Sequence, residues 1–179
     1  MKKVDEFITK SGKKIDIVLP SMDGLRPLLE MVNELTKEDT FLTFHGRPIS
    51  LKAEKNWLKN VLTSISRNNT FLIWAFDDEK IIASCDINRC GSREEHVGKL
   101  GLMVLKDYRN QGIGRYLLEY VLVQAKSMKI KIARLSVFSE NDIAISLYKK
   151  LGFEEWGRLP KGYYRKGKYS DRIDMYKNL

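Results

Sequence analysis

A glycine-containing segment between an apolar run and a long amphipathic stretch constrains the fold of this chain more than any other feature. The segment is residues 109–114, which read RNQGIG, and the apolar run is residues 100–105. A strand, a glycine loop and a helix in this order form a cradle for anions, because glycine lets several backbone N–H groups approach a phosphate and the helix dipole favours negative charge at its start. The segment therefore predicts a strand-to-helix unit that binds a phosphorylated ligand.

The residues around this loop exclude two common nucleotide-binding motifs. A dinucleotide fingerprint requires a third glycine where this chain has Leu117, and an acidic residue about twenty positions farther on, where the chain reads KIAR at 131–134. A P-loop requires Gly-Lys-Ser/Thr, but Gly114 is followed by Arg115 and Tyr116. One structural alternative stays open, in which the glycines only let the helix pack closely on the strand.

A second strand-to-helix unit follows at residues 133–153. Residues 133–137 have a strand pattern, Asn141 and Asp142 are suited to cap a helix, and Gly152 is placed to end it. Apolar residues recur between the cap and the end at helical spacing, at Ala144, Leu147, Tyr148 and Leu151. Without the first unit, Asn141 would be interpreted only as a cap and Tyr148 only as a core aromatic residue.

The two units together resemble the GNAT superfamily of acyl-CoA-dependent N-acetyltransferases. The family's R/Q-x-x-G-x-G/A loop corresponds to Arg109, Gly112 and Gly114. Its downstream N-x-x-A-x-x-x-Y-x-x-x-G-F pattern corresponds to Asn141, Ala144, Tyr148, Gly152 and Phe153. Either motif alone is weak evidence, whereas the ordered pair, each on its expected strand and helix, is specific. The resemblance covers residues 71–179.

The resemblance implies a single α/β domain over residues 1–179, with a mixed, mostly antiparallel central sheet of about six to seven strands and about four flanking helices. Residues 71–179 would form the acyl-CoA-binding core and residues 1–70 a variable, acceptor-side part. The hydropathy pattern agrees with this class of fold. It predicts helices at 23–35 and 51–65, a loop at 36–50, and strands at 14–19, 71–76, 81–88, 97–105, 133–137, 153–159 and 170–176.

The implied reaction is attack of a neutral amine on the thioester of acetyl-CoA, without a covalent enzyme intermediate. By resemblance, the backbone before the loop holds the pantetheine arm and polarises the carbonyl, at Leu102, Met103 and Val104. The loop would hold the pyrophosphate through N–H groups and side-chain charge, at Arg109, Asn110, Gln111, Gly112, Ile113, Gly114 and Arg115. Asn141 would contact the pantetheine arm. Tyr148 would protonate the leaving thiolate, because a tyrosine with the ordinary pKa of about 10 remains a donor at neutral pH.

The general base is less clearly marked, because the chain departs from the patterns of its relatives. Some relatives carry a glutamate at one position and others at a second. This chain has Gly98 at the first position and Ser136 at the second, and therefore has neither carboxylate. His96 precedes Gly98 by two residues, which would place it on the same face of the strand, and its intrinsic pKa suits a base. We take His96 as the candidate base, with a water relay to solvent as the alternative.

Composition limits the remaining possibilities. The net charge of +9 suits an anionic ligand such as coenzyme A or an acidic acceptor protein. Basic and aromatic residues interleave at 161–166 as in RNA-binding strands, but the basic residues are otherwise scattered, so nucleic acid is not the expected partner. Cys85 and Cys90 lack zinc-site spacing with His45 or His96, so we expect no metal. No apolar run approaches the length that spans a membrane, and we expect a cytoplasmic protein that is a monomer or homodimer.

The acceptor is expected to be a primary amine, with a protein or peptide amine favoured over a small amine or polyamine. Glu38, Asp39 and Glu54 could attract a cationic amine, or merely begin and cover helices. Several aromatic residues could line an acceptor groove, namely Phe41, Phe44, His45, Trp57, Tyr163, Tyr164 and Tyr169. Two alternatives from other functional classes are a non-catalytic acyl-CoA-binding sensor and a basic nucleic-acid-binding module.

Overall fold

The computed structural model describes residues 1–42 and 47–179, and these fold around one eight-stranded sheet. The strand order is β1-β2-β3-β4-β5-β6-β8-β7. The strands are β1 (Lys2–Ile8), β2 (Lys14–Leu19), β3 (Thr70–Asp77), β4 (Lys80–Arg89), β5 (Val97–Val104), β6 (Ile132–Phe138), β7 (Glu154–Arg165) and β8 (Lys168–Asn178). The helices are α1 (Leu25–Glu38), α2 (Leu51–Ser66), α3 (Ile113–Ser127) and α4 (Asp142–Lys150).

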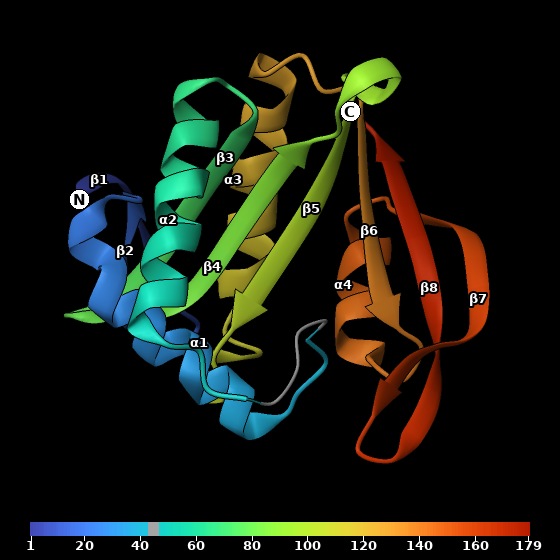
Figure 1. The fold of residues 1–179 in the computed structure, drawn as a ribbon, viewed down its shortest axis with the longest axis horizontal. Helices are drawn as coiled ribbons and strands as arrows, with labels where there is room; N and C mark the ends of the chain where they lie inside the picture. Colours follow the sequence, from blue (N-terminus) through green and yellow to red (C-terminus); the bar gives the residue numbers. More distant parts are fainter. Residues whose placement is uncertain (43–46) are drawn as a thin grey trace.

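The junction between β5 and β6 divides the sheet into two arms. These two strands are parallel, and their register covers Val97–Lys99 opposite Ile132–Arg134. The other neighbouring strands of the described residues pair antiparallel. Beyond the short parallel junction the arm that ends in β5 and the arm formed by β6, β8 and β7 diverge, which leaves a V-shaped opening in the ribbon (Figure 1).

Helices cover both faces of the sheet. Helices α1 and α2 lie in front of it in Figure 1 and contact β4 and β3, whereas α3 lies behind and contacts β3, β4 and β5. A Cβ placed on Gly114 of α3 would lie 3.7 Å from Leu147, so the start of α3 adjoins α4. Because both faces are covered, the central strand β3 is buried along most of its length instead of alternating between core and solvent.

The expected fold class is confirmed, with more strands than the six to seven expected. Sequence reasoning missed β1, whose burial pattern shows two half-buried positions, Val4 and Phe7, among exposed residues. An edge strand of this kind gains its order from pairing with β2 and from contacts such as the one between Phe7 and Tyr116, whose ring centroids lie 4.8 Å apart. Val4 and Phe7 are three residues apart, so the sequence of β1 lacks the alternation of apolar and polar residues that predicts a strand. Helix α1 also begins later than expected, because residues 22–24 form a 3₁₀ turn.

The β1–β2 hairpin supports the glycine loop. In the turn of this hairpin, the Lys10 N–H donates to the Gln111 carbonyl oxygen at 3.3 Å, and the Ser11 hydroxyl donates to the Gln111 side-chain oxygen at 3.0 Å. Gly112 has φ +91°, a left-handed conformation that favours glycine. A Cβ at this position would also lie 3.2 Å from the ring of Phe7. The loop that opens α3 is therefore held from outside as well as by its own turn.

The parallel junction is packed too tightly for a side chain at Gly98. A Cβ there would lie 2.7 Å from two carbons of Ile87, so we expect Gly98→Ala to lower the free energy of unfolding by about 1–3 kcal/mol. The matched control is Gly91→Ala, where φ is −90° and no heavy atom lies within 4 Å of the new Cβ. Urea denaturation followed by circular dichroism measures both variants. Equal stabilities of the two would contradict the packing argument.

Candidate active site

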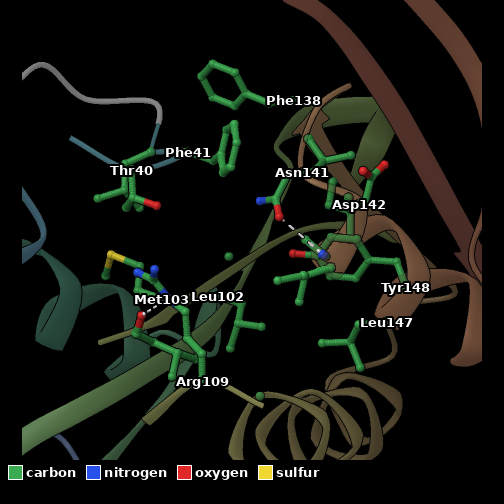
Figure 2. Close-up of a pocket in the computed structure, with 18 of the residues that line it drawn as sticks. Thr40, Phe41, Leu102, Met103, Arg109, Phe138, Asn141, Asp142, Leu147 and Tyr148 are labelled. Atoms are coloured by element: carbon green, nitrogen blue, oxygen red, sulfur yellow. Dashed lines mark hydrogen bonds between the residues drawn. The ribbon is translucent and has the colours of Figure 1, made fainter. Parts of the chain in front are cut away.

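The opening between the two arms of the sheet contains a large cavity. Its volume is about 1370 Å³, which exceeds the roughly 300–1,000 Å³ of an ordinary small-molecule pocket. Its walls come from the end of α1, the second half of β5, the glycine loop, the second half of β6, the start of α4 and the tip of the β7–β8 hairpin, together with Asp86 of β4. Figure 2 shows side chains from several of these elements around the same space. The cavity can therefore hold two reactants from different sides.

The second half of β5 offers unpaired backbone groups to this cavity. The Cys90 N–H donates to the Val97 carbonyl and the Leu105 N–H to the Ile82 carbonyl, which fixes the odd-numbered residues of β5 as those that bond to β4. Strand geometry then turns the backbone groups of Leu102 and Val104 toward the opening, where no described strand pairs with them. Of these groups, the Val104 carbonyl accepts from the Arg109 side chain, which leaves both Leu102 groups and the Val104 N–H to the cavity. Of the three predicted residues, Met103 presents its backbone to β4 and only its side chain lines the cavity.

The glycine loop presents a row of backbone donors. Within the described residues, no hydrogen bond is recorded from the N–H groups of residues 110–115. Helix α3 starts at Ile113, so its first N–H groups have no intrahelical acceptor. Asn110 and Gly112 both have positive φ, which turns successive N–H groups in one direction. The arrangement is the one that a phosphate cradle requires, although the Ile113 side chain is buried in the core.

The Arg109 side chain is engaged by the protein. Its two terminal nitrogens contact the Glu38 carboxylate at 2.5 and 2.7 Å, and its Nε donates to the Val104 carbonyl at 3.0 Å. Arg109 therefore ties the end of α1 to β5 and to the glycine loop. Glu38, considered above as a group that attracts an amine, is instead the partner of Arg109, and we call this ion pair the Arg109–Glu38 strut. All the guanidinium nitrogens have protein acceptors, so the geometry gives Arg109 a positioning role in place of a charge for the ligand.

Arg115 and Asn141 have partners but remain at the cavity. Arg115 lines the cavity and forms an exposed ion pair with Glu119 at 2.9 Å. The Asn141 side-chain oxygen accepts from the Ala144 N–H at 3.2 Å, so Asn141 is the N-cap of α4. This bond is the dashed line beside Asn141 in Figure 2. Its side-chain amide nitrogen has no partner recorded among the described residues, which leaves two N–H donors at the cavity wall.

Tyr148 lies almost completely buried on α4, with its hydroxyl directed into the cavity (Figure 2). Its ring packs on Phe153 with centroids 5.8 Å apart. Burial raises the pKa of the Tyr148 hydroxyl well above its usual value. The hydroxyl therefore keeps its proton through the neutral pH range and can act as a hydrogen-bond or proton donor.

The structure does not bring His96 to this cavity. The residue precedes β5, is exposed, and accepts bonds from the Lys131 and Ile132 N–H groups through its backbone carbonyl. It lies at the opposite end of β5 from Met103, roughly 20 Å away at about 3.3 Å per residue. The expectation that His96 shares a strand face with Gly98 placed it at the wrong end of the strand for a role at the cavity.

The aromatic residues expected at the acceptor side divide into two groups. Phe41 and Tyr163 line the cavity together with Phe138, and the Phe138 ring lies 5.5 Å from Phe41 and 4.1 Å from Tyr163 between centroids. Trp57, Tyr164 and Tyr169 are exposed and lie outside the cavity lining. Phe44 and His45 lie outside the described residues. The carboxylate of Glu54 is buried on α2, away from the cavity lining, and burial raises its pKa.

Asp86 is the site residue that sequence reasoning missed. It lies on β4 opposite Gly101, lines the cavity, and burial raises its carboxyl pKa to about 6. A signal for it exists in the sequence, since an aspartate interrupts an apolar strand segment at residues 81–87. Buried carboxylates are expensive unless they have a use or a partner. Among the described residues, no group of three or more His, Cys, Asp or Glu side chains could hold a metal ion, and no helix is long and apolar enough to cross a membrane.

Sequence comparison identifies relatives of this chain. A family model described as the acetyltransferase (GNAT) family matches residues 29–153. The L-amino acid N-acetyltransferase AaaT of Escherichia coli K12 is 32% identical over 84 residues, which is 46% of this chain and 52% of that protein. The ribosomal protein bS18-alanine N-acetyltransferase of the same strain is 38% identical over 58 residues, 32% of this chain and 38% of the relative. The chain thus matches about half, or less, of the length of these two relatives.

Solved structures share the whole fold. A GNAT-family acetyltransferase from Streptococcus pneumoniae superposes with a TM-score of 0.82 at 26% identity, covering 92% of this chain and 99% of that one. The acetyltransferase yncA from Salmonella typhimurium, solved with acetyl-CoA as its cofactor, gives a TM-score of 0.80 and covers 92% and 94% of the two chains. At 15% identity, the second likeness shows the fold alone.

The Arg109–Glu38 strut is expected to contribute measurably to stability. A double-mutant cycle with Glu38→Gln and Arg109→Gln should give a coupling free energy of about 1–2 kcal/mol in urea denaturation, because the pair is bidentate and largely shielded from solvent. The exposed Arg115–Glu119 pair is the control and should give about 0.3–0.5 kcal/mol. Equal coupling in the two cycles would contradict the role assigned to the strut.

Proposed function

This chain belongs to the GNAT acetyltransferase family, and from that membership we propose that it transfers the acetyl group of acetyl-CoA to a primary amine by direct attack, without a covalent enzyme intermediate. The observation that carries the proposal is one cavity that joins unpaired β5 backbone, the N–H cradle of the glycine loop and the buried hydroxyl of Tyr148. Each of these groups suits a different part of a thioester donor.

The donor would lie along the α3 and α4 side of the opening. The N–H groups of residues 110–115 would bind the pyrophosphate, with Arg115 adding positive charge. The N–H and carbonyl of Leu102 and the N–H of Val104 would bond the amide groups of the pantetheine arm as a neighbouring strand does, because the Val104 carbonyl already accepts from Arg109. The free amide of Asn141 faces the same space. This placement brings the thioester to the second half of β5.

The acceptor would enter from the face covered by α1 and α2. The amine nitrogen uses its lone pair to form a bond to the thioester carbon, the carbon–sulfur bond breaks as the thiolate leaves, and the nitrogen loses one proton to a base or to solvent. The polarised carbonyl would rest on the Leu102 N–H, and Tyr148 would donate its proton to the thiolate. Because the pKa of Tyr148 is raised by burial, this hydroxyl is protonated at the start of each turnover.

For the acceptor we favour the amine of a protein or peptide. The cavity lining continues from Asp86 on β4 to Arg165 and Lys166 at the tip of the β7–β8 hairpin, which suits an acceptor larger than a single amine group. A small amino acid is the second candidate, since the relative AaaT is named as an L-amino acid N-acetyltransferase and the bS18 enzyme as one acting on a protein alanine. The aromatic group Phe41, Phe138 and Tyr163 would contact either acceptor.

An amine panel tests the reaction and its acceptor. Release of CoA thiol from acetyl-CoA should be fastest with a peptide that has a free N-terminus or lysine, and slower with single amino acids and polyamines. A lysine-free peptide with a blocked N-terminus is the control. Stoichiometric acetyl-CoA binding by calorimetry without thiol release from any amine would indicate a sensor. Binding of RNA or DNA without binding of acetyl-CoA would indicate a nucleic-acid module.

Tyr148→Phe tests the proton donor. The substitution removes one hydroxyl and leaves the packed ring, so acetyl-CoA binding should persist while kcat falls about 100-fold, a typical contribution of general acid catalysis. Tyr164→Phe is the matched control, because Tyr164 is exposed and lies outside the cavity lining. Thiol release measures turnover and calorimetry measures binding. Unchanged kcat in Tyr148→Phe would remove Tyr148 from the mechanism.

A further inference from the structure

The carboxylate of Asp86 on β4 lies beside β5, in space left by the missing side chain of Gly101. It is opposite Gly101 in the β4–β5 register, and a Cβ on Gly101 would lie 2.7 Å from the Asp86 Oδ1. Any side chain at residue 101 would therefore displace the carboxylate. Gly101 directly precedes Leu102, whose backbone faces the opening. The carboxylate is thus one residue away from the backbone to which the proposed function assigns the thioester carbonyl.

Asp86 projects from the acceptor face of the sheet. Its partner on β3 is Leu72, and Trp74, two residues along β3, projects from the same face toward Gly24 beside α1. By contrast, Leu102 and Val104 project toward Gly114 on the α3 side. The carboxylate and the cradle of the glycine loop therefore lie on opposite faces of the sheet and share one cavity. An amine that approaches from the α1 and α2 face would meet Asp86.

A chain of polar side chains positions this carboxylate. The Asn88 side-chain N–H donates to the Asp86 Oδ2 at 2.5 Å, and the Thr70 hydroxyl donates to the Asn88 oxygen at 2.7 Å. Ser64 of α2 lies 2.7 Å from the same Thr70 hydroxyl. Within the described residues, Oδ1 of Asp86 has no hydrogen-bond partner recorded. One oxygen is therefore fixed by the fold and the other remains available to a ligand.

Burial and the charges near Asp86 place the pKa of its carboxyl group where the group can both accept and release a proton. Burial raises its carboxyl pKa to about 6, while the Asn88 hydrogen bond and the positive charge of Lys99 on β5 act in the opposite direction. The facing residue of β3 is Leu72, which carries no charge. From the end of α1, Glu38 and Asp39 line the same cavity and are paired with Arg109 and Lys166. A carboxylate of this kind is ionised at neutral pH and accepts a proton more readily than an exposed one.

We propose that Asp86 is the general base of the acetyl transfer and binds the acceptor amine through its Oδ1, an inference that rests on the function proposed above. As the nitrogen–carbon bond forms and the carbon–sulfur bond breaks, one amine proton passes to the Asp86 carboxylate. The proton of Tyr148 passes to the sulfur, so the products are the amide and CoA thiol. Solvent then takes the proton from Asp86 and returns one to Tyr148. An amine that binds as ammonium first loses its extra proton to the same carboxylate, which releases that proton to solvent before the transfer begins.

Asp86→Asn is the direct test, with acetyl-CoA and the best amine of the panel as substrates. The variant should bind acetyl-CoA normally, lose about 100-fold or more in kcat/KM, and lose the fall in rate below pH about 6 that protonation of Asp86 causes in the wild type. Asp16→Asn on β2, a residue outside the cavity whose side chain is half-exposed, is the matched control and should retain wild-type rates. Wild-type kcat/KM within about threefold, with the acidic limb retained, would overturn the assignment.

A second variant separates a chemical role from a structural one. Asn88→Ala removes the hydrogen bond that favours the ionised carboxylate, so the acidic limb of the wild-type profile should move up by about 0.5–1 pH unit. An unmoved limb would overturn the proposal even where Asp86→Asn fails to fold. Failure of the wild type to release thiol with any amine would refute the proposed function instead, and that result is read before either variant is made.

Discussion

The short parallel junction between β5 and β6 is the constraint on which the rest of the structure depends. Three residues of each strand pair before the arms separate, and at that point Gly98 of β5 also packs closely against Ile87 of β4 and Ile130, which lies just before β6. Beyond it, the β5 backbone must find hydrogen-bond partners outside the sheet, since an unpaired group shielded from water is costly. Under the proposed function, an extended ligand with amide groups would supply them. The opening interrupts the sheet and is the proposed binding site.

Contacts between distant parts of the chain hold the donor and acceptor sides of this opening. The β1–β2 hairpin bonds to Gln111 in the glycine loop, and Arg109 links the same loop to Glu38 at the end of α1. These contacts join the first forty residues to residues 71–179, the part expected to bind acyl-CoA. The first part of the chain therefore supports the glycine loop, in addition to the acceptor-side role expected for it.

The local motifs were well predicted because they depend on short-range backbone geometry. The strand, loop and helix around Gly112 follow from a positive φ at the turn, and the cap at Asn141 follows from the need of helix N–H groups for an acceptor. The predictions that required two distant segments to meet fared worse. Arg109 was expected at the phosphates and is instead paired with Glu38, and His96 was expected beside the thioester and lies at the far end of β5.

The sequence by itself determined the family, through the ordered pair of motifs, and the mixed α/β class, through the hydropathy pattern along the chain. The glycine loop that opens α3 and the position of Tyr148 on α4 come from motifs that each span fewer than fifteen residues. Only the tertiary structure decided that Asp86 shares the cavity with the β5 backbone and Tyr148. Asp86 reaches it because β4 pairs with β5 in a register that sets the aspartate opposite Gly101. Register between strands is fixed by packing of the whole sheet, and a single strand's sequence does not contain it.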